Sequence, residues 1–177
     1  LAGWGLPVEP EVEANTRAFA AALAAAGAVV EEVTVDLSRA ALLEAALVHY
    51  GSIMGPSMAA MGPADELPLE GYTRHFLALS GAAAARTSVY DGLTAESAVH
   101  AALAAVFDDH DVLVCPTVGG LGFEAEQEYA EGIDVAGVHH DLYLLAALTP
   151  VFNIASRHPV LNVPSGRASN GVPTGVQ

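Results

Sequence analysis

The residues of this chain that could perform chemistry are few, and the densest group is His139-His140-Asp141. Imidazole and carboxylate groups are metal ligands, but a site usually needs three or four converging groups. Facing side chains on a helix lie three or four positions apart, so adjacent histidines point in different directions. We therefore predict no metal site here and interpret the three residues as the start of a helix over residues 139–147.

Cys115 is the second candidate, because it is the only cysteine and follows the apolar run 111–115. The carboxyl end of a strand is where α/β proteins place functional groups. A thiolate nucleophile needs an adjacent base, and His110 lies at the opposite end of the predicted strand. Free cysteines are often buried, so we expect a buried thiol, with a Cys115-dependent enzyme as a weaker alternative. One cysteine excludes an internal disulfide and fits a reducing cytosol.

The remaining polar groups form no complete catalytic set. Asp108, Asp109 and Asp111 surround His110 at a helix end and indicate a solvated turn. The nine serines stand singly, without a Gly-x-Ser-x-Gly nucleophile elbow. The pair Ser165-Gly166 follows a proline and predicts a turn. The chain contains no lysine, which excludes a phosphate-binding loop of the Gly-Lys-Ser/Thr type.

Composition narrows the class of protein further. The 177 residues are 53% hydrophobic, enough for one domain, or a large part of one, with a sizeable core. Neither a long apolar run nor a secretory signal is present, so we predict a cytoplasmic protein that does not span a membrane. The start without methionine indicates a processed or excised segment. The net charge of −15, with six scattered arginines, argues against nucleic acid and anionic membranes as partners.

Helical and strand patterns alternate along the chain. Helices are predicted over residues 10–26, 39–54, 72–85, 94–108 and 139–147, with Asp36 or Ser38 capping the second, Thr94 capping the fourth and Pro150 ending the last. Strands are predicted over residues 29–35, 111–115, 160–163 and 172–177, and loops over 55–71 and 118–137. Because strands alternate with helices, the expected class is α/β with a mixed, partly parallel sheet and helices packed on it.

Four segments, in order, carry a resemblance to a known family. They are Gly-Leu-Pro-Val-Glu-Pro-Glu-Val at 5–12, Ala-Ala-Gly-Ala-Val-Val-Glu-Glu-Val at 25–33, Asp-Val-Leu-Val-Cys-Pro-Thr at 111–117, and a closing set of Thr149, Asn153, Pro159, Pro164, Gly166, Gly171, Pro173, Gly175 and Gln177. Together they resemble the C-terminal part of the amidase signature family of serine amidohydrolases. The chain departs from the family where Ile-Ala-Ser-Arg-His separates Asn153 from Pro159, since the family commonly has a shorter turn with a glycine. The middle, residues 51–93, matches no family segment, and we expect a subgroup-specific substrate region there.

The resemblance implies a Ser–Ser–Lys mechanism, in which one serine attacks an amide carbonyl and a lysine manages the proton through the second serine. That lysine and the glycine/serine-rich signature loop belong to an upstream part that this sequence lacks. The resemblance therefore implies that residues 1–177 are a single incomplete domain, the C-terminal half of an α/β/α amidase domain. No catalytic residue, metal or cofactor is predicted, and the chain alone is expected to be inactive.

What the resemblance does imply is a position for the substrate. The loop after residue 116 is similar to a wall of the family's acyl pocket, so Thr117, Val118, Gly119, Gly120 and Phe123 are the predicted substrate-binding residues. The expected partners are a small amide substrate, reached through the complete domain, and the missing N-terminal half or a second copy. The alternative hypothesis is a non-catalytic acidic α/β binding module or a degenerate amidase relative.

Overall fold

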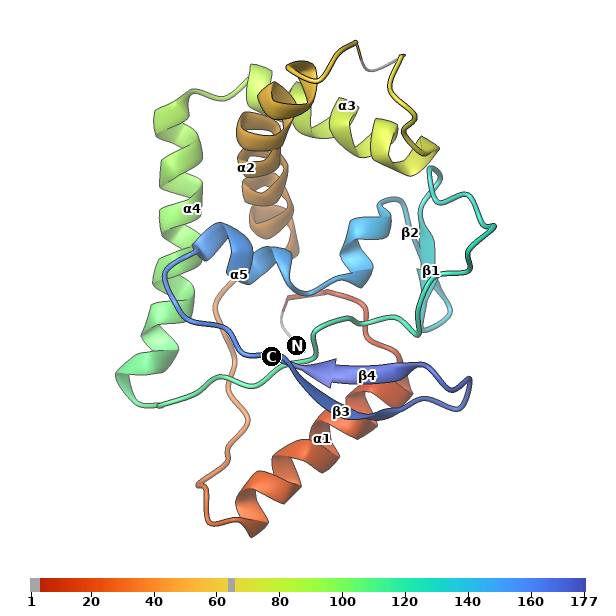
Figure 1. The fold of residues 1–177 in the computed structure, drawn as a ribbon. Helices are drawn as coiled ribbons and strands as arrows, with labels where there is room; N and C mark the ends of the chain where they lie inside the picture. The colour runs from red at the N-terminus through yellow and green to blue at the C-terminus, as the bar shows by residue number, and fades with distance from the viewer. Residues whose placement is uncertain (1–3, 64–65) are drawn as a thin grey trace.

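The computed structural model describes residues 4–63 and 66–177 and contains α-helices and two short β-hairpins in that part of the chain (Figure 1). The helices are α1 (Pro10–Ala25), α2 (Arg39–Ala59), α3 (Gly71–Ala85), α4 (Val89–Ala104) with the 3₁₀ turn η1 (Ala105–Asp108), η2 (Tyr143–Ala146) and α5 (Pro150–Ala155). The strands are β1 (Ile133–Val135), β2 (Val138–His140), β3 (Val163–Arg167) and β4 (Pro173–Val176). Within the described ranges, every helix is too short or too polar to cross a bilayer.

The main hydrophobic core is built by helices α2, α4 and α5 together with the N-terminal segment. Its buried members include Trp4, Leu42, Leu103, Val151 and Ile154. The indole Nε1–H of Trp4 donates a hydrogen bond of 3.2 Å to the carbonyl oxygen of Val35, which satisfies the one polar group of this buried ring. A smaller cluster around Tyr129, Ile133, Val135 and Ala146 lies beside the β1–β2 hairpin.

Both hairpins are antiparallel. Ile133 pairs with His140 in the first, and Val163 pairs with Val176 in the second, whose register shifts between Pro164 and Gly166. Helix α1 lies against the β3–β4 hairpin, as Figure 1 shows near the bottom of the molecule. No parallel pair of strands occurs in the part of the chain that the structure describes, so the expected partly parallel sheet is not observed there.

Three predicted strands lie wholly or mostly outside the named β-strands. Residues 29–35 and 111–114 belong to no strand, and of the predicted strand 160–163 only Val163 belongs to β3. A strand is defined by its hydrogen-bonded neighbour, and these segments find little or none among the described residues. The β-branched composition therefore did not supply the pairing that makes a strand.

Three other predictions are wrong for local reasons. Residues 139–147 do not form one helix, because the Ala136-Gly137 turn, with φ of 54° and 74°, closes the β1–β2 hairpin and places the two histidines on β2. The predicted loop 55–71 begins as helix, since α2 continues to Ala59. Pro56 lies in the last turn of α2, where it has no N–H to donate to the carbonyl oxygen four residues earlier, and the helix ends within that turn. Pro150 does not end a helix but begins α5, which ends at Ser156 in the left-handed conformation, with φ of 46°.

Helix α2 starts as predicted, whereas α4 starts earlier than predicted. The hydroxyl of Ser38 accepts a hydrogen bond from the Ala41 amide, so it caps α2. At α4, Ser88 accepts from the Asp91 amide and the Asp91 carboxylate accepts from the Ser88 amide, which makes a reciprocal capping box. Thr94 lies inside the helix and its hydroxyl donates to the Tyr90 carbonyl oxygen over 2.9 Å. The cap is therefore Ser88 and not Thr94.

Substituting alanine for Ser88 and, separately, for Thr94 tests which of the two residues caps α4. We predict that Ser88→Ala lowers the free energy of unfolding by about 1 kcal/mol, because the Asp91 amide loses its side-chain acceptor. Thr94→Ala is expected to be neutral or to stabilise by up to roughly 0.5 kcal/mol, because alanine is the better helix former. Urea unfolding followed by circular dichroism measures both values, and the opposite order would show that α4 begins at the later residue.

Candidate functional site

The candidate site is organised by residues 115–119, whose backbone is paired on two sides. Toward the C-terminus, Cys115 and Gln177 exchange two backbone hydrogen bonds of 3.0 and 2.8 Å, and the Thr117 amide donates to the Gly175 carbonyl oxygen over 3.0 Å. Pro116 thereby bridges Val176 in antiparallel fashion. The segment thus adds a third short strand to the edge of the β3–β4 hairpin at its open end.

The same segment then turns to pair with the chain before α5. The Gly119 amide donates to the Ala146 carbonyl oxygen, and the Leu148 amide donates to the Thr117 carbonyl oxygen over 3.0 Å. The Gly119 carbonyl oxygen accepts from the Glu9 amide over 2.8 Å. Residues 115–119 therefore connect the C-terminal hairpin, the entry to α1 and the segment 146–148.

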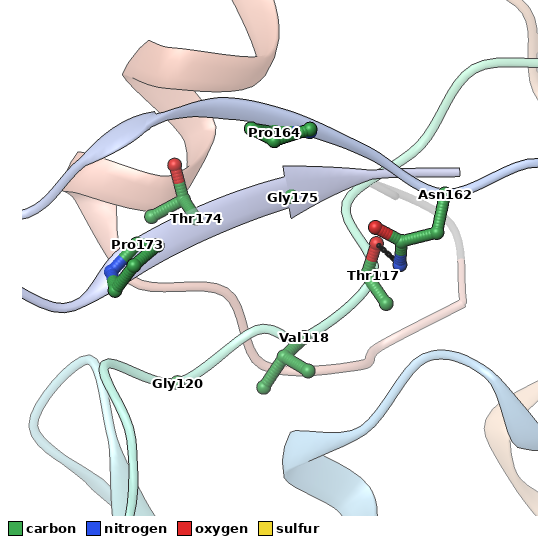
Figure 2. Close-up of a pocket in the computed structure, with 8 residues that line it drawn as sticks. All are labelled: Thr117, Val118, Gly120, Asn162, Pro164, Pro173, Thr174 and Gly175. Carbon is green, nitrogen blue, oxygen red and sulfur yellow. Dashed lines mark hydrogen bonds between the residues drawn. The ribbon is translucent and has the colours of Figure 1, made fainter.

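A pocket of about 260 Å³ lies where this segment crosses the hairpin, and Figure 2 shows its lining. Three of the lining residues, Thr117, Val118 and Gly120, come from the predicted substrate loop. The others are Asn162, Pro164, Pro173, Thr174 and Gly175 from β4, β3 and the residue just before β3. The pocket therefore forms only when residues from distant parts of the sequence meet.

A polar pair sits at one end of this pocket. The side-chain amide of Asn162 donates to the Thr117 hydroxyl oxygen over 2.7 Å, and Figure 2 shows the two groups facing each other. A Cβ at Gly175 would lie 3.1 Å from the Asn162 side-chain oxygen and 3.2 Å from the Thr117 hydroxyl oxygen. Glycine at this position therefore leaves the space that the pair occupies.

Thr174 faces a different set of polar groups. Its hydroxyl oxygen accepts from the Asn15 side-chain amide over 3.0 Å and lies 2.9 Å from the Ser165 hydroxyl oxygen. Ser165 is in strand β3 at the register shift and not in a turn, so that prediction is wrong. Its hydroxyl links β3 to Thr174 of β4, and no base is near it in this hydrogen-bond network.

The two remaining predicted residues do not line the pocket. Gly119 is buried, and a Cβ there would lie 2.0 Å from the Pro7 carbonyl oxygen, which explains glycine by close backbone approach. Phe123 is half-exposed and packs edge-on against Tyr129, with ring centroids 5.1 Å apart. The predicted role of both in substrate binding remains a prediction.

Cys115 is 2% exposed, as expected of a buried thiol. Burial raises the pKa of this thiol to about 12, against the smaller opposing effect of a hydrogen bond from Gln177. His110 offers it no base, because one ring nitrogen lies 2.8 Å from the Val106 carbonyl oxygen and the other 2.6 Å from a Glu31 carboxylate oxygen. A thiol held protonated without a partner base is a poor nucleophile.

The two adjacent histidines lie on opposite faces of β2. His139 is exposed, and its hydrogen bonds to the Asp134 carboxylate and the Glu131 carbonyl oxygen raise its pKa. His140 is buried without a hydrogen-bond partner for either ring nitrogen among the described residues, and burial lowers its pKa. Across those residues, no group of three or more potential ligands is placed to hold a metal ion.

Comparison with known proteins identifies the family. The family model described as Amidase matches residues 4–177. The chain belongs to the amidase signature family. A solved structure of a bacterial aryl acylamidase, one of the amidase signature enzymes, is similar with a TM-score of 0.72 and 25% sequence identity. The similarity covers 96% of this chain and 36% of that protein. A search of curated proteins finds no match.

The pocket of this amidase chain is lined by neutral groups. Its side chains offer two hydroxyls and one carboxamide beside proline, valine and glycine. Such groups donate and accept hydrogen bonds but do not exchange protons near neutral pH. The arrangement can therefore bind and orient a neutral polar molecule, whereas general acid–base catalysis needs a titratable group that this wall lacks.

Thr117, Val118 and Gly120 line the pocket, and the substrate-binding role that the family resemblance implied for them stays a prediction. The lining residues from the hairpin and the residue before it were not predicted. Asn162 and Gly175 were not predicted as lining residues, although Gly175 belongs to the C-terminal motif. The sequence signal that could have pointed to these lining residues was the hairpin, because its two strands and its Gly/Ser/Asn turn were recognisable in the sequence. The register of β4 against residues 115–117 was needed to place Asn162 beside Thr117.

Gly119 and Gly120 allow a matched test of whether glycine at position 119 is required by close packing. We predict that Gly119→Ala lowers the free energy of unfolding by roughly 1–3 kcal/mol, because the new methyl group collides with backbone. Gly120→Ala is expected to change it by less than about 0.5 kcal/mol, since its Cβ would make only ordinary contacts, 3.8 Å from Ala146 Cβ. Equal effects in chemical unfolding would contradict a packing role for Gly119.

Proposed function

We propose that this chain is the C-terminal segment of an amidase-type hydrolase that cleaves carboxamide C–N bonds. In this proposal it supplies scaffold and a wall of the substrate pocket, while the catalytic groups come from another part of the protein. The observation that carries the proposal is the family match over residues 4–177 in a chain without lysine. Coverage of 36% of the aryl acylamidase supports it, because the larger part of that enzyme has no counterpart here.

The side chains of the wall fit a role in substrate binding, with the catalytic groups supplied by another part of the protein. Amide hydrolysis through an acyl-enzyme needs a nucleophile, a proton carrier and donors for the oxyanion. The lining contributes no proton carrier, and its two threonine hydroxyls have no base beside them to make either a nucleophile. Thr117 accepts the hydrogen bond from Asn162, so its own O–H remains to donate to a substrate carbonyl, and the Asn162 side-chain oxygen remains to accept from a substrate N–H. A carboxamide presents both of these partners.

The proposed substrate class is a small neutral amide. Because no charged side chain lines it, this wall offers no partner for a substrate carboxylate or ammonium group. The similar enzyme is named an aryl acylamidase, so an aryl acylamide is the first substrate to test. A 4-nitroanilide of a short carboxylic acid reports hydrolysis directly, because released 4-nitroaniline absorbs visible light.

The 177-residue chain alone is expected to release no 4-nitroaniline above the buffer rate. The longer polypeptide encoded by the same gene with its upstream region is expected to hydrolyse the amide. The rate of 4-nitroaniline release is measured by absorbance for the isolated chain and for the longer polypeptide at equal concentration. Turnover by the isolated chain that survives repeated purification would contradict the proposal. A longer protein that binds the amide without cleaving it would contradict it too, because that is the behaviour of a binding module.

A substitution in the longer protein tests the wall. We predict that Thr117→Val raises KM about 3- to 10-fold, the equivalent of one neutral hydrogen bond, with kcat within about twofold. Ser165→Ala is the matched control, because its hydroxyl bonds to Thr174 and does not line the pocket. Steady-state kinetics on the 4-nitroanilide decides. An unchanged KM, or a fall in kcat equal to that in kcat/KM, contradicts a binding role for this wall.

A further inference from the structure

Three aromatic rings from different elements form a stack at the end of α4. The imidazole of His158, in the linker between α5 and β3, lies between His100 of α4 and Phe107 of η1, with ring centroids 5.0 and 4.8 Å away. Its plane is inclined by 30° to each of these two rings. Figure 1 shows the linker passing the lower part of α4 on its way to β3. An inserted ring therefore holds this linker to α4.

The spacing of His100 and Phe107 leaves room for one ring. Seven residues make about two helical turns, so the two side chains lie on one face of the helix, roughly 10 Å apart along its axis. A ring with its centroid 5.0 Å from one and 4.8 Å from the other fills that gap. The inserted ring comes from the Ile-Ala-Ser-Arg-His stretch at which this chain departs from its family.

The stack lies only a few residues before a side chain of the pocket. His158 is followed directly by Pro159, whose ring fixes its own φ, and the same segment then reaches Asn162. The Asn162 side-chain amide donates to the Thr117 hydroxyl oxygen over 2.7 Å, as Figure 2 shows. The position of His158 therefore sets where the segment that carries Asn162 begins.

Positive charge is poorly accommodated in this stack. The Nδ1 atom of His100 is buried and has no hydrogen-bond partner among the described residues, so a proton there would lack an acceptor. Burial, the Arg157 guanidinium and His158 all lower the pKa of His100. Two protonated imidazoles with centroids 5.0 Å apart would repel each other, and Arg157 would repel both.

The neighbouring elements do not offset this charge. Glu96, one turn earlier on α4, has a carboxylate oxygen 2.6 Å from Nδ1 of His49 on α2, and Asp108 of η1 is exposed. Helix α5 packs on α4 and contains no charged residue. Within the described ranges, no carboxylate forms an ion pair with His100 or His158. Because the folded state lowers the pKa of His100, the stacked form is favoured above the ordinary value of 6.5 and loses stability as the pH falls through the lowered pKa.

We infer that His158 is a positioning residue for the pocket wall and that the Phe107–His158–His100 stack is its acid-sensitive latch. With neutral imidazoles, the latch holds the start of the segment that places Asn162 against Thr117. When both imidazoles are charged, the His158 ring leaves α4 and Asn162 loses its hydrogen bond to Thr117. The effect on substrate binding rests on the proposed function, whereas the latch itself does not.

Nuclear magnetic resonance on the 177-residue chain tests the latch without any activity. The side-chain amide signal of Asn162, assigned by its absence in Asn162→Ser, and the imidazole signals of His100 and His158 are followed from about pH 7.5 to about pH 5. We expect the Asn162 signal to shift with the same midpoint as the His100 signal. An Asn162 signal that does not follow the titration of His100 overturns the inference.

His158→Phe tests the role of charge, because it keeps a stacked ring that cannot be protonated. The second cation is then absent, and the remaining charge on His100 faces an aromatic ring, which attracts it. We therefore expect the midpoint of the Asn162 shift to fall by at least about one pH unit in this variant. An unchanged midpoint contradicts a latch that depends on charge in the stack.

Steady-state kinetics on the longer polypeptide test the consequence for the pocket. We expect KM for the 4-nitroanilide to rise at least about threefold between about pH 7.5 and about pH 5.5 in the wild type and by less in His158→Phe, with equal kcat in the two proteins at each pH. His139→Gln removes an exposed histidine on β2 and is the control that should keep the wild-type profile.

The outcomes separate this inference from the proposed function. Hydrolysis with the same KM profile in the wild type and in His158→Phe overturns the positioning role of His158 and leaves the function. A longer polypeptide that does not hydrolyse the amide, in a protein whose Asn162 signal follows the titration of the stack, contradicts the proposed function and leaves the latch.

Discussion

Two-sided pairing of residues 115–119 is the constraint on which the arrangement of this chain depends. Buried backbone groups must find hydrogen-bonding partners, and this segment finds them in the end of β4, in residues 146–148 and in Glu9. The three regions come from opposite ends of the sequence and share no other extensive ladder. The pocket lies where this segment meets the hairpin, because its lining comes from these two regions and the residue just before β3.

Helices were easier to predict than strands because their hydrogen bonds are local. Helix α1 was predicted to end at residue 26 and ends at Ala25, and α2 begins at the predicted cap, Ser38. The start of α4 was missed because its capping box uses Asp91 at the third position, whereas the prediction rested on the apolar periodicity that follows Thr94. Strand 29–35 has the expected composition, but pairing is a non-local property that composition cannot supply.

The residues of the candidate site also differ in whether their position depends on local sequence or on non-local pairing. The motif around Pro116 led, through family resemblance and not through spacing, to the prediction of Thr117, Val118 and Gly120 as substrate-binding residues. These three residues line the pocket, and their role in substrate binding stays a prediction. Asn162 has no sequence signal of its own, because its position beside Thr117 depends on a hairpin register that contains a bulge. Gly119 was predicted as a substrate residue, whereas its observed contacts are with backbone of the entry to α1. Among glycines in a motif, sequence alone does not distinguish close packing from ligand access.

Ser156, the left-handed residue after α5, makes the connection to β3 conformationally expensive. The family commonly has a shorter turn with a glycine between the positions of Asn153 and Pro159. This chain instead places a side chain at φ of 46°, which costs about 1–2 kcal/mol relative to an ordinary conformation. That cost falls on the linker directly before residues 157–162. A residue persists in such a conformation only where the surrounding structure offsets its cost, and here Ile154 and Ala155 are buried immediately before it.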